Sequence, residues 1–269
     1  MTNMRLVKKM KKKKNIVFNF YSVLFFILIL AVWEIVSRTG AFPEYILPAP
    51  TKILSSVFIN FRLYRFDLII TIIETLSGFL IAMVLAFITS VLMDSFKAVN
   101  KILYPLLITS QTIPIITLAP LFIIWFGYGL LPKIIIVILI CFFPITVSLL
   151  SGFANADYEQ INLLKSMKAN RFHIYKYIKL PSSLPGFFSG LKIAATYSIT
   201  GATIGEWVGG KDGIGVFMIR AKHSFATDKV FGAILIITIL SILFIRLIDA
   251  IEKKSMPWKK FEKNEVLEE

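Results

Sequence analysis

The sequence predicts an all-α protein that crosses a membrane about six times, and three observations support this prediction. Hydrophobic residues make up 57% of the chain and charged residues only 17%, whereas soluble domains average about 45–50% and about 25%. The apolar residues form unbroken runs of about twenty residues, the length of a membrane-spanning helix. These runs are too long and too uniform for barrel strands, so helices are expected to satisfy the backbone in lipid.

Six apolar runs are the predicted spans. They cover approximately residues 16–37, 67–93, 102–126, 133–152, 186–208 and 231–250. Lys and Arg are concentrated at both ends of the chain and in the second and fourth connections, and the positive-inside rule places those segments in the cytoplasm. We therefore expect a basic cytoplasmic N-terminus at 1–15, a transmembrane domain at 16–250 and a cytoplasmic tail at 251–269.

The net charge of +14 is explained by this topology. A basic chain can bind nucleic acid, but here the basic residues lie between the apolar runs and at the ends, so we expect no nucleic-acid partner. The lysines before the first run resemble the start of a signal peptide. That run is longer than a signal-peptide core and lacks a small-residue cleavage site, so we expect a retained first helix.

Metal and redox chemistry are not expected of this chain. Cys141 is its one cysteine, and His173 and His223 are its two histidines. Because no Cys and His residues cluster at the spacing of metal ligands, we expect no cofactor to be bound by the chain itself.

The fourth connection, residues 153–185, is the longest polar stretch between spans. Apolar side chains recur through it at roughly helical spacing, namely Ile161, Leu164, Met167, Ile174, Tyr177 and Ile178. Asn at Ala169-Asn170 is a good residue to end one helix and begin another. We predict two short amphipathic helices, the second ending at Pro181. Periodicity alone leaves open whether they lie on the membrane surface or dock into a groove of a partner.

The end of this loop resembles the cytoplasmic coupling loop of ABC-importer permeases. Ile178-Lys179-Leu180-Pro181 matches the Ile-x-Leu-Pro with which the family's pattern ends. The front half departs from the pattern: Asn162, Leu163 and Leu164 occupy its Glu-Ala-Ala positions and Lys168 its Gly position. Because Lys carries a Cβ atom, we expect Lys168 to keep an ordinary backbone conformation. The resemblance implies contacts to an ATPase from Asn162, Leu163, Leu164, Lys168, Ala169, Leu180 and Pro181.

Other segments resemble the sulfonate, taurine, nitrate and thiamine-precursor branch of these permeases over nearly the whole chain. They are residues 47–51, 110–114, 119–129, 190–198 and 205–207. Within the branch, Ser-Gln-Thr-Ile-Pro at 110–114 together with Trp-Phe-Gly-Tyr-Gly at 125–129 is most similar to permeases for pyrimidine precursors of thiamine. The resemblance therefore implies a path for such a precursor, with a sulfonate, nitrate or riboflavin-type solute as alternatives.

The resemblance also implies the partners. The chain has no Gly-x-x-x-x-Gly-Lys-[Ser/Thr] phosphate loop, so ATP and Mg would be used by a separate ATP-binding subunit. An extracytoplasmic solute-binding protein, a second permease chain forming a homodimer, and membrane lipid would complete the assembly. An ion-coupled transporter would show inverted repeats and paired mid-membrane charges, and a membrane enzyme would need clustered catalytic groups. The sequence shows neither pattern clearly, so an ion-coupled secondary transporter is kept as the less favoured alternative to the importer.

Polar residues inside predicted spans are costly in lipid, so each is a candidate for the translocation path. Gln111 offers a donor and an acceptor and adjoins Thr112. In the fifth span, Tyr197 and Thr200 are candidates to face substrate, and Glu206 is a candidate to gate the path or pair with a cation. Bonding between helices is the alternative role for such side chains. Glu74, in the second span, is expected to pair with a basic residue or to contact substrate.

Overall fold

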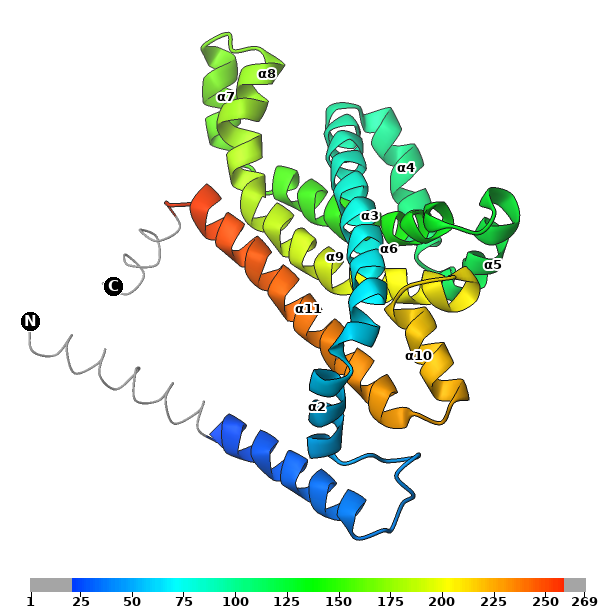
Figure 1. Cartoon of the computed structure of the whole chain (residues 1–269). Helices are drawn as coiled ribbons and strands as arrows, with labels where there is room; N and C mark the ends of the chain where they lie inside the picture. The colour runs from blue at the N-terminus through cyan, green and yellow to red at the C-terminus, as the bar shows by residue number, and fades with distance from the viewer. Residues whose placement is uncertain (1–20, 259–269) are drawn as a thin grey trace, which may run out of the picture. The chain divides into compact units, whose positions relative to one another are not determined.

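The computed structural model describes residues 21–258, and the structural results below concern these residues alone. They are built from helices and turns, with no β-strand among them (Figure 1). The predicted all-α class is therefore confirmed. The predicted N-terminal segment 1–15 and residues 259–269 of the predicted tail lie outside the described residues.

Several helices are long and apolar enough to cross a membrane. Four qualify individually: Tyr21–Arg38, α3 (Phe61–Ser95), α6 (Leu130–Ala154) and α11 (Thr227–Ser255). The bent pair α4 (Lys97–Ser110) and α5 (Ile115–Phe126) makes a fifth if it counts as one span. Helix α9 (Leu180–Gly209) has 30 residues, long enough at about 1.5 Å per residue, but its Gly, Ser and Thr content makes it less apolar. The membrane class is confirmed, and the count of six stays a prediction.

The predicted span at 102–126 is a bent pair of helices in the structure. Helix α4 ends at Ser110 and α5 begins at Ile115, and the two axes are bent by 102°. Pro114 explains the break, because proline lacks an N–H group and disfavours helical geometry in the residue before it. Pro114 itself has an extended conformation, with φ −62° and ψ 116°, and serves as the N-cap of α5.

The expected end of the second loop helix at Pro181 is wrong. Helix α8 (Arg171–Ile174) continues through a π-helical turn η1 (Tyr175–Lys179) directly into α9. Pro181, which has no N–H group to donate, is the second residue of α9 and lies just after this turn. The turn before it is wide, since the Leu180 N–H donates to the Tyr175 carbonyl five residues back. The loop and the following long helix are therefore one continuous helical rod.

Helices α6 and α9 form the most extensive helix pair. Small residues bring their backbones together: a Cβ atom on Gly152 would lie 2.7 Å from the Cα atom of Ser183, and one on Gly190 would lie 2.9 Å from the Pro144 carbonyl oxygen. Such close approach is how helices associate in lipid. Helices α7 (Tyr158–Ser166) and α8, which connect this pair, project beyond the ends of α6 and α9 (Figure 1).

The chain divides into two compact units. One comprises residues up to Phe61 together with Arg220–Ala233, and it includes α2 (Pro50–Ile59). Within that unit the Ser56 hydroxyl donates to the Asp228 carboxylate at 2.7 Å. The other unit comprises Arg62–Ile219 and residues from Ile234 onward. Every site described below lies in this second unit.

Candidate functional site

The loop between α6 and α9 folds as a helical hairpin of α7 and α8, called the α7–α8 hairpin below. Asp157 caps α7, its carboxylate accepting a hydrogen bond from the Glu159 N–H at 2.8 Å. Asn170 caps α8, its side-chain oxygen accepting from the His173 N–H at 2.9 Å. These residue types are the preferred N-caps because they satisfy otherwise unpaired helix N–H groups. The predicted pair of helices, divided at Ala169-Asn170, is confirmed.

Lys168 has a left-handed backbone, with φ +60°, so the expected ordinary conformation is wrong. The cause is the turn that ends α7. The Ala169 N–H donates to the Leu164 carbonyl at 3.0 Å, and the Lys168 N–H donates to the Lys165 carbonyl at 2.9 Å. This pair of bonds defines a Schellman motif, in which the position of Lys168 strongly favours glycine. The chain therefore keeps a glycine-type turn at the position where the resembled pattern has glycine.

We expect Lys168→Gly to stabilise the α7–α8 hairpin by up to about 1 kcal/mol. A left-handed conformation costs a residue with a Cβ atom about 1–2 kcal/mol, and glycine gives back about 0.4–1 kcal/mol through the unfolded chain. Amide hydrogen exchange at Ala169 should slow in this variant. Lys168→Ala is the matched control, because it removes the charge and keeps the Cβ atom; equal exchange in both variants would refute the strain.

The α7–α8 hairpin exposes large apolar side chains. The most exposed are Tyr158, Leu163, Met167 and Phe172, together with Tyr177 in the adjoining η1, at 59–70% of their full area. Among the residues predicted to contact an ATPase, Leu163 and Lys168 are exposed, and the others, Asn162, Leu164, Ala169, Leu180 and Pro181, are half-buried. A concentration of exposed apolar groups on one element marks an interaction surface.

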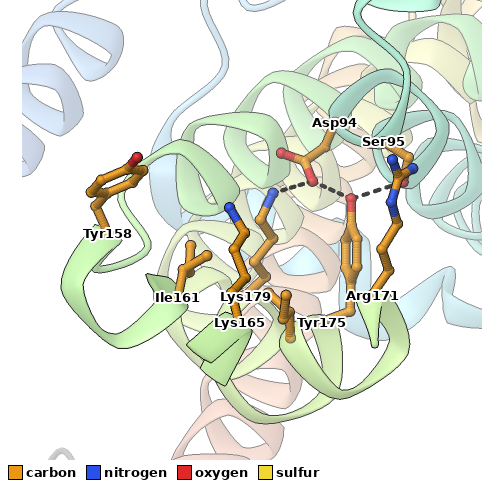
Figure 2. Close-up of a pocket in the computed structure, with 9 residues that line it drawn as sticks. Asp94, Ser95, Tyr158, Ile161, Lys165, Arg171, Tyr175 and Lys179 are labelled. Atoms are coloured by element: carbon orange, nitrogen blue, oxygen red, sulfur yellow. Dashed lines mark hydrogen bonds and ion pairs between the residues drawn. The ribbon is translucent and has the colours of Figure 1, made fainter. Parts of the chain in front are cut away.

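A polar cluster at the base of the hairpin, called the base cluster below, comprises Asp94, Ser95, Tyr175 and Lys179 (Figure 2). The Asp94 carboxylate accepts from the Tyr175 hydroxyl and from the Lys179 ammonium, the latter at 2.5 Å. The Ser95 and Tyr175 hydroxyls are 2.9 Å apart. Burial, together with the bond to Asp94, raises the pKa of Tyr175 to about 12, so its hydroxyl remains a donor at neutral pH. Sequence reasoning missed Asp94.

Three of the five predicted path residues line one pocket of about 600 Å³ among α4, α5, α6 and α9. They are Gln111, Tyr197 and Thr200. Ser148 also lines it and was missed, because a serine in an apolar run is common. The remaining lining is apolar: Ile115, Ile140, Phe143, Pro144, Val147, Ile193 and Ile204. Thr112 does not line this pocket.

The three path candidates in this pocket are exposed in the single chain, and Tyr197 shows 53% of its area. Polar groups facing hydrocarbon are costly, so such groups normally face a cavity or another protein surface. The pocket has a volume typical of small-molecule sites, which run from about 300 to about 1,000 Å³. The pocket therefore combines an exposed, partly polar lining with a volume that can hold a small molecule.

Glu206 lies elsewhere, buried in a polar network at 1% exposure. Its carboxylate accepts from the Thr71 hydroxyl at 2.6 Å and from the Gly215 N–H at 2.5 Å. Beside it, the Lys133 ammonium pairs with the Glu74 carboxylate, and it also donates to the Asp212 carbonyl at 3.1 Å. The basic partner expected for Glu74 is therefore present, and Glu206 fixes the start of α10 (Ile214–His223) against α3.

The chain matches one known family of membrane proteins. Residues 78–256 match the family described as binding-protein-dependent transport system inner membrane component. The chain belongs to this permease family. The permease is therefore a membrane-embedded transport subunit, as its fold and hydropathy indicate.

Individual relatives place the permease more closely. It is 36% identical over 238 residues to the formylaminopyrimidine transport permease protein ThiX of Halalkalibacterium halodurans, covering 88% of this chain and 95% of that protein. It is 28% identical over 234 residues to the riboflavin transport system permease protein RibX of Chloroflexus aurantiacus, covering 86% and 87%. These relatives confirm the predicted similarity to the branch of the family that includes thiamine-precursor permeases.

A solved structure shares the fold. The crystal structure of an amino acid ABC transporter with histidines aligns with a TM-score of 0.62 at 14% identity, over 75% of the permease and 98% of that chain. At this identity the likeness shows the fold alone.

Proposed function

We propose that the permease forms the translocation path for a small uncharged heterocycle of the thiamine pyrimidine-precursor class. A solute-binding protein would deliver the solute to the outer face, and ATP hydrolysis by a partner subunit would drive import. The relative named for formylaminopyrimidine, at 36% identity, supports this solute class. Riboflavin-type solutes, sulfonates and nitrate remain the alternatives within the family.

The chemistry of the 600 Å³ pocket carries the proposal. Its polar side chains are an amide and three hydroxyls, from Gln111, Ser148, Tyr197 and Thr200, and none of the described residues that line it is charged. A sulfonate or nitrate ion in this pocket would lose its hydration shell and find no cation to pair with, which is energetically costly. An aminopyrimidine can instead stack on the Tyr197 ring and bond to both ends of the Gln111 amide.

The α7–α8 hairpin is the proposed docking element for the ATPase. Its exposed apolar side chains could enter an apolar groove of the partner, which is how short amphipathic helices often bind. This role places the hairpin in the cytoplasm, with both chain ends on the same side, and assigns ATP and Mg to the partner subunit. Two permease copies in a homodimer would enclose the path, and closure of the ATPases would rock the spans between inward and outward access.

We expect Gln111→Leu to reduce formylaminopyrimidine uptake by up to about tenfold, with little loss of stability. Deleting a hydrogen-bonding group that faces a neutral solute costs about 0.5–1.5 kcal/mol, and 1.4 kcal/mol is a factor of ten. Uptake would be measured in cells against thermal stability of the purified permease. Thr112→Val is the matched control, since this exposed neighbour does not line the pocket. Equal losses of uptake and stability in Gln111→Leu would assign Gln111 to packing.

The solute class itself is tested by offering labelled formylaminopyrimidine, riboflavin and an aliphatic sulfonate to the same cells. Uptake of the pyrimidine alone supports the proposal. Uptake of the sulfonate with equal efficiency would contradict the role assigned to the uncharged pocket.

A further inference from the structure

The base cluster connects the end of α3 to the stem of the α7–α8 hairpin. Asp94 and Ser95 are the last two residues of α3, and Tyr175 and Lys179 are the first and last residues of the π-helical turn η1. Figure 2 shows the Asp94 carboxylate between the Lys179 ammonium and the Tyr175 hydroxyl. About eighty residues of sequence separate the end of α3 from η1. The bonds of the base cluster therefore connect two elements that are far apart along the chain.

Asp94 is placed against the local preference of its helix. The carboxyl end of a helix carries partial negative charge, which favours cations and disfavours a carboxylate there. The last turn of α3 contains no basic residue to compensate. Compensation comes from Lys179 in the hairpin stem, and the two side chains are only 15–19% exposed. An acidic residue kept at such a position, with its partner on another element, points to a role in the contact between the elements.

The hairpin side of the cluster is similarly specific. Tyr175 donates to Asp94, lies 2.9 Å from the Ser95 hydroxyl and packs its ring 5.7 Å from that of Phe153 near the end of α6. The Lys179 ammonium lies 5.1 Å from the centre of the same ring. These contacts are made by a π-helical turn, a costly geometry that recurs at functional sites. Through Tyr175, the hairpin stem therefore contacts the ends of both α3 and α6.

We propose that Asp94 is the positioning residue that couples the α7–α8 hairpin to α3. It would make the hairpin stem and the end of α3 move as one body when the ATPase displaces the hairpin. Without the Asp94 bonds, the hairpin could tilt on its own and leave α3 behind. This inference rests on the proposed docking of the hairpin to an ATPase.

Asp94→Asn tests this role with little change in shape. The amide cannot pair with the Lys179 ammonium as a carboxylate does, so the ion pair is lost. In proteoliposomes containing the complete transporter, we expect ATP hydrolysis and co-purification of the ATPase to persist. The amount of formylaminopyrimidine imported per ATP hydrolysed should fall about tenfold. An unchanged ratio would overturn the proposal, whether or not the variant is less stable.

Two variants separate coupling from a general structural effect. Asp157→Asn is the matched control, because it removes an exposed carboxylate from the same hairpin and Asn caps a helix as well as Asp; its ratio should equal that of the unaltered protein. Lys179→Met by itself should lower the amount of solute imported per ATP hydrolysed. Combining it with Asp94→Asn should lower this ratio little further, as expected for two residues in one pair. Additive losses would overturn the assignment of the effect to this pair.

A second readout is independent of the solute. ATP-dependent change in hydrogen exchange at the end of α3 should occur in the unaltered complex and disappear in Asp94→Asn, while exchange in the hairpin still responds. Failure of formylaminopyrimidine uptake in the unaltered complex would refute the proposed solute and leave this readout intact. Persistence of the α3 response in Asp94→Asn would overturn the coupling role alone.

Discussion

Leu163→Glu is expected to abolish binding of the ATPase while the permease still inserts and folds. Leu163 is 63% exposed on the α7–α8 hairpin, so a carboxylate there remains in water in the free chain. In an apolar docking groove the same carboxylate would be buried without a partner, which costs several kcal/mol. Since each 1.4 kcal/mol is a factor of ten in affinity, binding should weaken at least a hundredfold.

Affinity purification from detergent-solubilised membranes, with mass spectrometry of the bound proteins, measures this loss. Leu163→Met is the matched control, because it keeps an apolar side chain of similar size. Leu164→Glu is a poorer test, since Leu164 is half-buried and its substitution also disturbs the hairpin. If the ATPase remains bound to Leu163→Glu and uptake is unchanged, the hairpin is a membrane-surface element and not the docking site.

Lys133→Met is expected to destabilise the permease by about 3–5 kcal/mol, the usual effect of removing one partner of a buried ion pair. Lys133 and Glu74 have side chains only 5% and 0% exposed, and Glu206 lies in the same network. Removing the ammonium leaves two buried carboxyl groups without their cation. The loss should appear as a large fall in the thermal unfolding temperature of the purified permease and as poor accumulation in membranes.

The paired change Lys133→Met with Glu74→Gln should recover much of this loss, because neutral groups in place of a buried pair are often tolerated. Lys192→Met is the matched control, because it removes a lysine from an ion pair outside this network. Lys192 pairs with Asp249 and Glu252, but its side chain and that of Asp249 are about one-third exposed, and such pairs contribute at most about 1 kcal/mol. Equal stability of the Lys133 and Lys192 variants would show that the buried network is not required.

Features set by local chemistry were predictable from the sequence. Apolar runs indicated the membrane class, and Asn170 marked the division of the hairpin because an Asn side chain can cap a helix. Pro114 could be recognised in the sequence as a helix-breaking residue, but the 102° bend could not be predicted, because an apolar run indicates burial in lipid and not the direction of the chain. The left-handed Lys168 was missed because its residue type argues against the conformation that its neighbours impose.

Features set by distant pairing were not predictable. Gln111 and Thr200 could be chosen as polar residues in apolar runs, but only the fold brings them to one pocket. Asp94 has no distinguishing neighbour in sequence, and its partners lie about eighty residues away. Its one local signal is an acidic side chain in the last turn of a helix, where the helix dipole disfavours it.

The anchoring of α10 has a consequence for which substitutions this permease can tolerate. Asp67, Thr71 and Glu206 hold residues 213–215 by their main-chain N–H groups. These bonds use main-chain N–H groups and do not depend on side-chain identity. Lys211 lies just before this stretch and has no part in the bonds, so its substitution leaves them intact. Gly213 cannot, because it has φ +123° and a Cβ atom there would lie 2.2 Å from the Glu206 carboxylate. Among related permeases, natural variation should therefore be abundant at position 211 and almost absent at position 213.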